Sequence, residues 1–173
     1  MRPPVTPRPA AFLDRDGVLN LDVGYPHLEA HLTLVPGAAE AVSRLNRRGF
    51  FTVIVTNQSG VARGLFDLET MDAFNALLVR RLAEQGAVID AVYACPYHDT
   101  AVDPRWLHPD HPDRKPNPGM LLRAAAEHDL DLGQSLMIGD RDSDMEAARR
   151  AGVRGFLFKG PDLNEFVSGL LDA

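Results

Sequence analysis

The stretch that decides the fold is Ala11-Phe12-Leu13-Asp14-Arg15-Asp16-Gly17-Val18-Leu19-Asn20. It opens on a short apolar run that ends at a charged turn, which is typical of a buried strand. Outward from it, apolar runs alternate with segments whose apolar residues recur at helical spacing. Strands are predicted at 10–13, 51–55, 88–94, 135–138 and 154–158, and helices between Gly37 and Gly49, between Asp67 and Gly86, and at 118–128, 142–151 and 163–171. This order predicts an α/β fold with a doubly wound, mostly parallel sheet and helices on both faces.

Proline marks the segments that lie outside this alternation. Four of the 13 prolines fall within the first nine residues, so residues 1–10 are expected to form an extended tail and residues 11–173 a single domain. Six more prolines and three of the six histidines fall between Pro96 and Pro118. A long loop is therefore predicted at about 96–114, and loops of that length in compact domains are often functional.

Composition excludes several classes of protein. The 24 acidic residues outnumber the 18 Lys and Arg residues, and no long basic run is present, so we expect no nucleic-acid partner. No apolar run reaches the roughly 18–20 residues that cross a membrane, so no membrane partner is expected either. The single cysteine, Cys95, cannot form an internal disulfide, which agrees with a reducing cytoplasm. A chain of this size is expected to be a monomer.

Polar residues gather where the predicted strands end, which is where parallel α/β sheets place their ligand sites. The strand-end groups are Asp14-Arg15-Asp16-Gly17, Thr56-Asn57-Gln58-Ser59 and Gly139-Asp140-Arg141-Asp142-Ser143-Asp144, and Arg114-Lys115 precedes the helix before the fourth strand. Asp14, Asp16 and Asp140 would repel one another unless a cation lay between them, and oxygen ligands suit Mg²⁺. The Thr56 hydroxyl, backbone N–H groups and Lys115 suit a phosphoryl group. Together these groups could transfer a phosphoryl group through an aspartyl phosphate.

Taken singly, each group has an ordinary structural explanation. An Asp-x-Asp-Gly sequence is often only a turn, Thr56 suits a helix N-cap, and most lysines are solvated at the surface. A calcium loop starting at Asp140 is excluded because Met145 stands where glycine is required and Ala151 where glutamate is required. The signal that favours chemistry is the order of the groups along alternating strands and helices.

The four motifs resemble those of phosphatases of the haloacid dehalogenase superfamily, from about Ala11 to about Phe158. The matching stretches are Asp14-Arg15-Asp16-Gly17-Val18, Thr56-Asn57, Lys115 and Gly139-Asp140-x-x-x-Asp144. The resemblance implies that Asp14 is the nucleophile and that Asp16 protonates the leaving alcohol and then activates water. It also implies Mg²⁺ on Asp14, the Asp16 carbonyl and Asp140, with Thr56 and Lys115 on the phosphoryl oxygens. Asp144 is expected to support Lys115 or the waters of the metal.

A closer resemblance is to the histidinol-phosphate and heptose-bisphosphate phosphatase branch, through 14–25, 55–64 and 114–120. Gly24-Tyr25 and Pro36-Gly37 favour the heptose side, which implies removal of the 7-phosphate of D-glycero-D-manno-heptose 1,7-bisphosphate. The substrate contacts implied by the resemblance are Asp22, Gly24, Tyr25, Asn57, Gln58, Ser59, Arg114 and Arg141. A bisphosphate also needs a second cationic clamp, for which Arg63, Arg114 and Arg141 are candidates. Histidinol phosphate or another small phosphoester stays an alternative substrate.

The sequence departs from larger and from zinc-bearing relatives. Only about fifteen residues separate the first motif from the helix after Pro36-Gly37, too few for a cap domain. Zinc-bearing members carry a Cys-x-His…Cys-x-Cys loop, whereas here Tyr97, His111 and Asp113 follow Cys95 at the other ligand places. A shifted set of Cys95, His98, His108 and His111 has acceptable ligand types. We nevertheless expect no structural zinc.

Two other classes of function share part of this pattern. A receiver-like phospho-acceptor domain combines Asp, Thr and Lys on a similar sheet, but it places the acceptor at the end of a middle strand. Here the third predicted strand ends in Ala94-Cys95, which offers no carboxylate. A non-catalytic module that binds a phosphorylated ligand would have no use for both Asp14 and Asp16.

Overall fold

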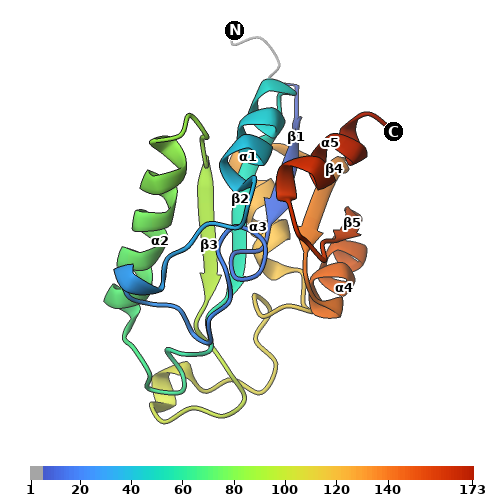
Figure 1. The fold of residues 1–173 in the computed structure, drawn as a ribbon. Helices are drawn as coiled ribbons and strands as arrows, with labels where there is room; N and C mark the ends of the chain where they lie inside the picture. The colour runs from blue at the N-terminus through green and yellow to red at the C-terminus, as the bar shows by residue number, and fades with distance from the viewer. Residues whose placement is uncertain (1–5) are drawn as a thin grey trace, which may run out of the picture.

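The computed structural model describes residues 6–173, which form one α/β unit (Figure 1). The strands are β1 (Arg8–Leu13), β2 (Phe51–Asn57), β3 (Ala91–Cys95), β4 (Leu130–Gly139) and β5 (Arg154–Leu157). The helices are α1 (Ala38–Arg47), α2 (Leu68–Ala83), α3 (Gly119–His128), α4 (Asp142–Ala151) and α5 (Leu163–Leu171). All strand pairs are parallel, in the order β3-β2-β1-β4-β5, so the predicted doubly wound sheet is confirmed.

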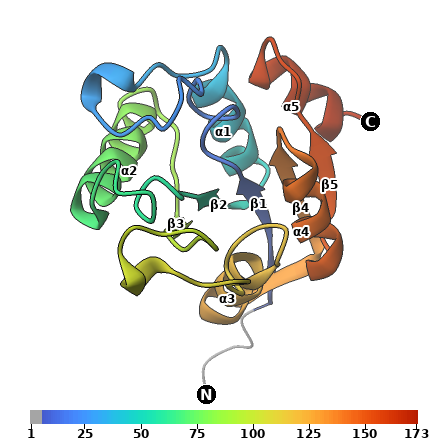
Figure 2. The same cartoon turned by 90° about the horizontal axis from the view of Figure 1, so that it is seen from below.

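Helices cover both faces of the sheet because successive strand residues point to opposite sides. Ala11 and Leu13 of β1 pack in a core with α1, α2 and α5, whereas Ala10 and Phe12 pack in a second core with α3 and α4. Figure 2 shows α1, α2 and α5 on one side of the sheet and α3 on the other. Both faces of the sheet are covered at its centre, so the end of β1 and most of β2 are buried and mostly apolar, whereas β5 at the edge is largely exposed.

Several predicted boundaries were wrong. β1 begins at Arg8, so residues 8–10 belong to the sheet and not to the extended tail, while residues 1–5 of that tail lie outside the described residues. β4 begins at Leu130 rather than at 135, because residues 8–9 pair with residues 130–131 before a register shift. β3 begins at Ala91 rather than at 88, because the backbone of Val88 is bonded to the side chain of Asn46 instead.

Loops rather than a further domain join the elements at the carboxyl end of the sheet. Between β1 and α1 the chain contains only the short 3-10 helix η1 (Glu29–His31), and between β3 and α3 only η2 (Pro104–Trp106). The described residues thus contain no cap domain, in agreement with the sequence. Within the same part of the chain, no helix has the length and apolar character needed to cross a membrane.

Candidate active site

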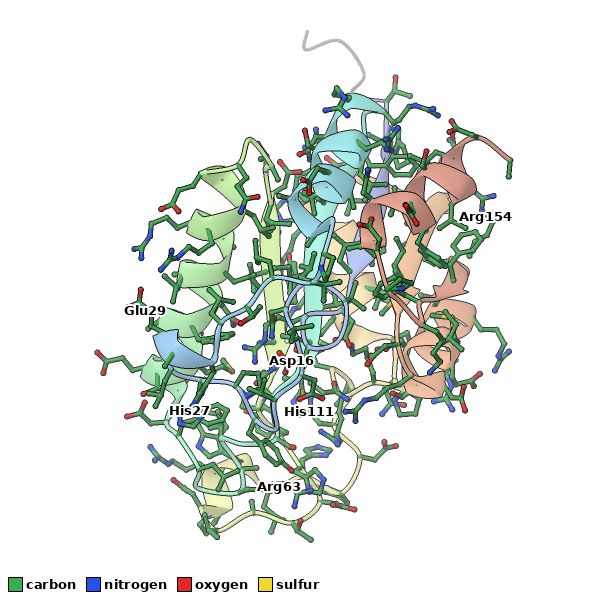
Figure 3. The ribbon with its side chains drawn as sticks, viewed as in Figure 1. Asp16, His27, Glu29, Arg63, His111 and Arg154 are labelled. Carbon is green, nitrogen blue, oxygen red and sulfur yellow. The ribbon has the colours of Figure 1, made fainter. Side chains whose placement is uncertain are left out.

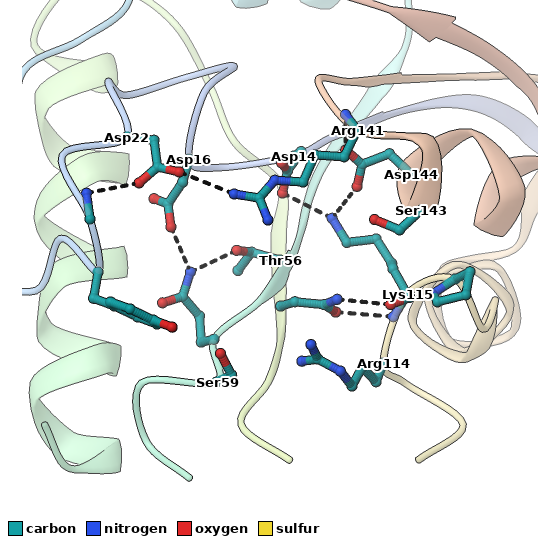
Figure 4. A pocket seen from close by; sticks show the side chains of 15 residues that line it. Asp14, Asp16, Asp22, Thr56, Ser59, Arg114, Lys115, Arg141, Ser143 and Asp144 are labelled. Carbon is teal, nitrogen blue, oxygen red and sulfur yellow. Dashed lines mark hydrogen bonds and ion pairs between the residues drawn. The ribbon is translucent and has the colours of Figure 1, made fainter. Parts of the chain in front are cut away.

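The site lies where the strand order reverses. The chain runs from β1 outward to β2 and β3, then returns to the other side of β1 as β4, so the ends of β1 and β4 form the switch point where such sheets bind ligands. The Asp14 N–H donates to the Ile138 carbonyl over 3.0 Å, which sets the end of β1 beside the end of β4. A pocket of about 550 Å³ opens there (Figure 4). Its lining residues are Asp14, Asp16, Asp22, Gly24, Tyr25, Thr56, Asn57, Gln58, Ser59, Arg114, Lys115, Pro116, Arg141, Ser143 and Asp144.

Lys115 joins two carboxylates at the floor of this pocket. Its ammonium lies 2.9 Å from Asp14 Oδ1 and 2.6 Å from Asp144 Oδ1, and it also donates to the Val55 carbonyl over 2.8 Å. All three charged side chains are buried. The second Asp144 oxygen accepts the N–H groups of Asp140 and Arg141 at the start of α4, each over 3.1 Å. Asp144 therefore fixes Lys115 to the end of β4.

Burial dominates the electrostatics of these groups. The pKa of the Asp14 carboxyl is raised to about 7, because the loss of solvation and the neighbouring Asp144 and Asp140 together outweigh the lowering effect of Lys115. Burial by itself would lower the pKa of the Lys115 ammonium, but the carboxylates of Asp14 and Asp144 raise it above the ordinary value. Lys115 is thus protonated at neutral pH, and its ammonium faces the carboxylates of Asp14 and Asp144.

The carboxylate of Asp140 lies beside those of Asp14 and Asp144. One oxygen from each of Asp14, Asp140 and Asp144 lies within 4.8 Å of the others. Asp140 Oδ1 is buried and has no hydrogen-bond partner among residues 6–173. A buried carboxylate oxygen without a donor is costly unless a cation contacts it. The cluster therefore fits a hard divalent cation.

Two glycines make room for this arrangement. Gly17 has a φ of +88°, and a Cβ built there would lie 2.2 Å from Asp140 Oδ2. At Gly139 an added Cβ would lie 2.2 Å from the Cβ of Asp144. Only glycine allows the backbone to approach the two carboxylates this closely.

Asp16 lies on the opposite side of the pocket from Lys115. Its carboxylate accepts hydrogen bonds from Arg15 at 2.8 and 3.1 Å, from Asn20 at 3.0 Å and from Gln58 at 3.1 Å. Figure 4 shows Asp16 linked through the Gln58 amide to Thr56, whose hydroxyl accepts from Gln58 over 2.8 Å. The side chain of Asp16 keeps 20% exposure, so it can reach a ligand in the pocket.

Asn57 holds the backbone of Lys115. Its Nδ2 donates to the Lys115 carbonyl over 2.9 Å, and its Oδ1 accepts the Lys115 N–H over 3.0 Å. The structure thus adds a function to a residue that the sequence placed among the substrate contacts. Because Asn57 is the last residue of β2, this pair of bonds ties the loop carrying Lys115 to the sheet.

The remaining predicted contacts form the rim. Arg141 Nη2 lies 3.3 Å from Asp22 Oδ2, and Asp22 Oδ1 accepts the N–H of Gly24 over 3.0 Å. Tyr25 is 42% exposed at the mouth. Arg63 lies outside the lining of the pocket in the described chain, with its guanidinium 5.9 Å from the Tyr25 ring and 3.3 Å from His98 Nε2.

The loop at 96–114 is organised by aromatic contacts. Tyr97 stacks on His111 with ring centroids 4.0 Å apart, and Cys95 Sγ lies 3.9 Å from His111 Nδ1. The position of His111 is labelled in Figure 3. His98 Nδ1 instead contacts Thr100, so it is not directed at Cys95. That the loop holds no zinc stays a prediction, which metal analysis of the purified protein tests.

Sequence reasoning missed the buried residues behind Asp16. Arg15 is fully buried and bonds Asn75 of α2, and neither residue was assigned a function. A polar side chain among the apolar positions of the 67–86 helix was the available signal for Asn75, since buried polar groups need partners. Pro116 and Ser143 also line the pocket and were not predicted.

Comparisons with known proteins agree with this geometry. The pattern of the HAD-hydrolase-like family matches residues 113–160. The chain is 47% identical to a D-glycero-beta-D-manno-heptose-1,7-bisphosphate 7-phosphatase from Mesorhizobium japonicum over 153 residues, 88% of this chain and 70% of the relative. It is 40% identical to a D-glycero-alpha-D-manno-heptose-1,7-bisphosphate 7-phosphatase from Burkholderia mallei over 144 residues, covering 83% and 76%.

A solved structure supports the same assignment. The crystal structure of D,D-heptose 1,7-bisphosphate phosphatase from B. bronchiseptica, complexed with magnesium and phosphate, aligns with a TM-score of 0.79 at 32% identity, covering 95% of this chain and 98% of that one. The identity extends over most of the chain, and the strand ends carry the expected carboxylates and lysine. The chain therefore belongs to the haloacid dehalogenase (HAD) superfamily, as one of its phosphatases.

Proposed function

We propose that this phosphatase is Mg²⁺-dependent and removes the 7-phosphate of D-glycero-D-manno-heptose 1,7-bisphosphate through a phosphoryl group carried on Asp14. The names of the two relatives and the magnesium and phosphate of the B. bronchiseptica structure support this proposal. The observation that carries it is the convergence of Asp14, Lys115 and the unpaired Asp140 oxygen at the switch point. A cytoplasmic, monomeric enzyme acting on a small phosphorylated sugar is part of the proposal.

Mg²⁺ would be held by Asp14, the backbone carbonyl of Asp16 and Asp140. The free Asp140 Oδ1, with a carboxylate oxygen of Asp14 within 4.8 Å of an Asp140 oxygen, fits such an ion. When bound, it supplies positive charge that lowers the repulsion between Asp14 and a phosphate dianion. Asp144 is unsuited to direct coordination, because both of its oxygens are already bonded to Lys115 and to the start of α4.

In the first step a carboxylate oxygen of Asp14 attacks phosphorus, and the bond between phosphorus and the sugar oxygen breaks. Asp16 donates a proton to that departing oxygen. Lys115 and the Thr56 hydroxyl bind the non-bridging oxygens as charge shifts onto them. In the second step Asp16 takes a proton from water, the water oxygen attacks phosphorus, and the bond to Asp14 breaks.

The rim provides charge for a second phosphate. Arg114 and Arg141 line the pocket, and guanidinium groups bind phosphate through two parallel hydrogen bonds. The Arg141 guanidinium lies 3.3 Å from Asp22 Oδ2, and its side chain is 67% exposed, so it can turn toward a ligand at little cost. Arg63 would contribute from just outside the pocket.

A rate comparison tests the substrate. Both anomers of heptose 1,7-bisphosphate and histidinol phosphate are assayed side by side, with Mg²⁺ and with EDTA. We expect the highest kcat/KM for a heptose bisphosphate, no turnover in EDTA, and no turnover by Asp14→Asn. Preference for histidinol phosphate would contradict the proposed substrate, and equal activity in EDTA would contradict the proposed Mg²⁺ requirement.

A further inference from the structure

Arg15 is a charged side chain enclosed by protein. It is completely buried, although it stands between two pocket residues in the sequence. Its guanidinium lies 4.6 Å from the centre of the Phe74 ring on α2, which covers one of its faces. A buried guanidinium is tolerated only when its N–H groups find acceptors.

The acceptors of Arg15 come from three separate parts of the chain. Nε and Nη2 form a fork on the two oxygens of Asp16, at 2.8 and 3.1 Å. Nη2 also donates to the Pro26 carbonyl over 3.1 Å, and Nη1 donates to Asn75 Oδ1 over 2.8 Å. The guanidinium thus connects Asp16 to the loop before α1 and to helix α2.

Asn75 is the contact that fixes the far end of this guanidinium. It is 5% exposed, it lies on α2, and it is not among the residues that line the active-site pocket. Guanidinium is planar, so an acceptor that orients Nη1 also orients the Nε and Nη2 fork. Loss of Asn75 Oδ1 would leave a buried Nη1 without an acceptor, and the group would rotate to find another one.

We propose that Asn75 is a positioning residue for the reaction, which holds Asp16 through Arg15 in the orientation needed to protonate the leaving alcohol. The inference rests on the proposed function, because it assumes that Asp16 is the general acid. Asn75 itself touches neither substrate nor metal. A structural role alone would stabilise the fold without favouring one leaving group over another.

The test uses leaving groups that differ in their need for a proton. A primary alkyl phosphate, either heptose 1,7-bisphosphate or histidinol phosphate, requires protonation of its departing oxygen, whereas p-nitrophenyl phosphate releases a stable phenolate without it. The quantity compared between the two substrates is kcat/KM, because it reports only the steps up to departure of the alcohol or phenol. For Asn75→Leu we expect a loss of about 10- to 100-fold on the alkyl phosphate and less than about threefold on p-nitrophenyl phosphate.

Two variants separate positioning from stability. Asn75→Asp keeps an acceptor oxygen beside Nη1 and is expected to retain both activities within about threefold. Asn46→Leu removes a side chain on α1 that bonds the backbone of Val88. We expect it to lower Tm while leaving the ratio of the two kcat/KM values unchanged. Thermal unfolding of each variant shows that the folded protein is being assayed.

The outcomes are distinct. An equal loss by Asn75→Leu on both substrates, or no loss on either, contradicts positioning while the phosphatase function stands. The same selective loss in Asn46→Leu also contradicts positioning. If the unaltered chain with Mg²⁺ hydrolyses neither substrate, the proposed function fails, and the positioning role fails with it.

Discussion

The ammonium of Lys115 lies 2.9 Å from Asp14 Oδ1, and both side chains are buried. These residues are 101 positions apart in the sequence, and the parallel sheet brings them together at one edge. In the proposed reaction this contact would offset part of the charge on Asp14 as a phosphate dianion approaches.

Asn57 should matter for turnover through the backbone of Lys115. Asn57→Ala removes the two hydrogen bonds to the Lys115 N–H and carbonyl, so the ammonium is no longer fixed relative to Asp14. We expect kcat to fall about 10- to 100-fold, corresponding to about 1–3 kcal/mol. Steady-state kinetics measures this, with Asn164→Ala on α5 as the control. Unchanged kcat in Asn57→Ala would show that Lys115 does not depend on Asn57.

Gly17 should be needed for metal binding as well as for the turn. In Gly17→Ala the new Cβ displaces Asp140, whereas Gly49→Ala has a similar positive φ of +83° with open space around it. Both variants carry the left-handed strain of about 1–2 kcal/mol. Each should therefore lose about 2–4 °C in Tm per kcal/mol. Only Gly17→Ala should require about tenfold more Mg²⁺ for half-maximal activity, consistent with about 1.4 kcal/mol of lost metal affinity. An equal requirement in both variants would contradict the close approach of Asp140.

Mg²⁺ should stabilise the folded protein through Asp140. At a concentration about 100-fold above Kd, binding contributes about 2.7 kcal/mol, or about 5–10 °C in Tm. Asp140→Asn should remove most of this shift, since it weakens the free buried oxygen. Asp142→Asn, on the exposed start of α4, should retain it. Thermal unfolding with and without Mg²⁺ measures the shift in Tm for each variant. A full shift in Asp140→Asn would show that Mg²⁺ binds elsewhere.

Cys95 should be chemically inert in the folded protein. Burial raises the pKa of its thiol to about 11 from 9.0, so the reactive thiolate is disfavoured. Because the folded pKa is the higher one, the associated stability is fully present below pH 9 and is lost as the pH rises toward 11. Iodoacetamide at pH 8 should label Cys95 only after unfolding in denaturant. Rapid labelling of the native protein would contradict the burial of this thiol.

The sheet could be predicted because its strands are buried on both faces. Residues 51–55 are apolar or β-branched, so the prediction of this strand did not depend on distant contacts. The extra residues of β1 and β4 could not be predicted in the same way. Arg8 and Pro9 pair with residues 130–131 only because the two strands meet, and proline before a strand indicates a loop when read locally.

That Asp14, Asp140 and Lys115 would come together could be predicted from the order of the motifs along the chain, whereas their supporting contacts could not. Nothing in the sequence indicates that both amide atoms of Asn57 bond the backbone of a residue 58 positions away. Arg15 is similar, because a charged residue in a turn is usually solvated, and its burial depends on where α2 packs. Contacts of this kind are set by tertiary packing and not by local pattern.

Trapping the phosphoenzyme tests the role of Asp14 most directly. Asp16→Asn with Mg²⁺ is mixed with p-nitrophenyl phosphate, whose phenolate leaves without a proton, so Asp14 should be phosphorylated while hydrolysis stalls. We expect intact-protein mass spectrometry to show one added phosphoryl group, and peptide mapping to place it on Asp14. The double variant that carries both Asp14→Asn and Asp16→Asn should show no added phosphoryl group. A phosphoryl group on another residue would contradict Asp14 as the nucleophile. Release of p-nitrophenol with no phosphorylated protein at any time would contradict it too.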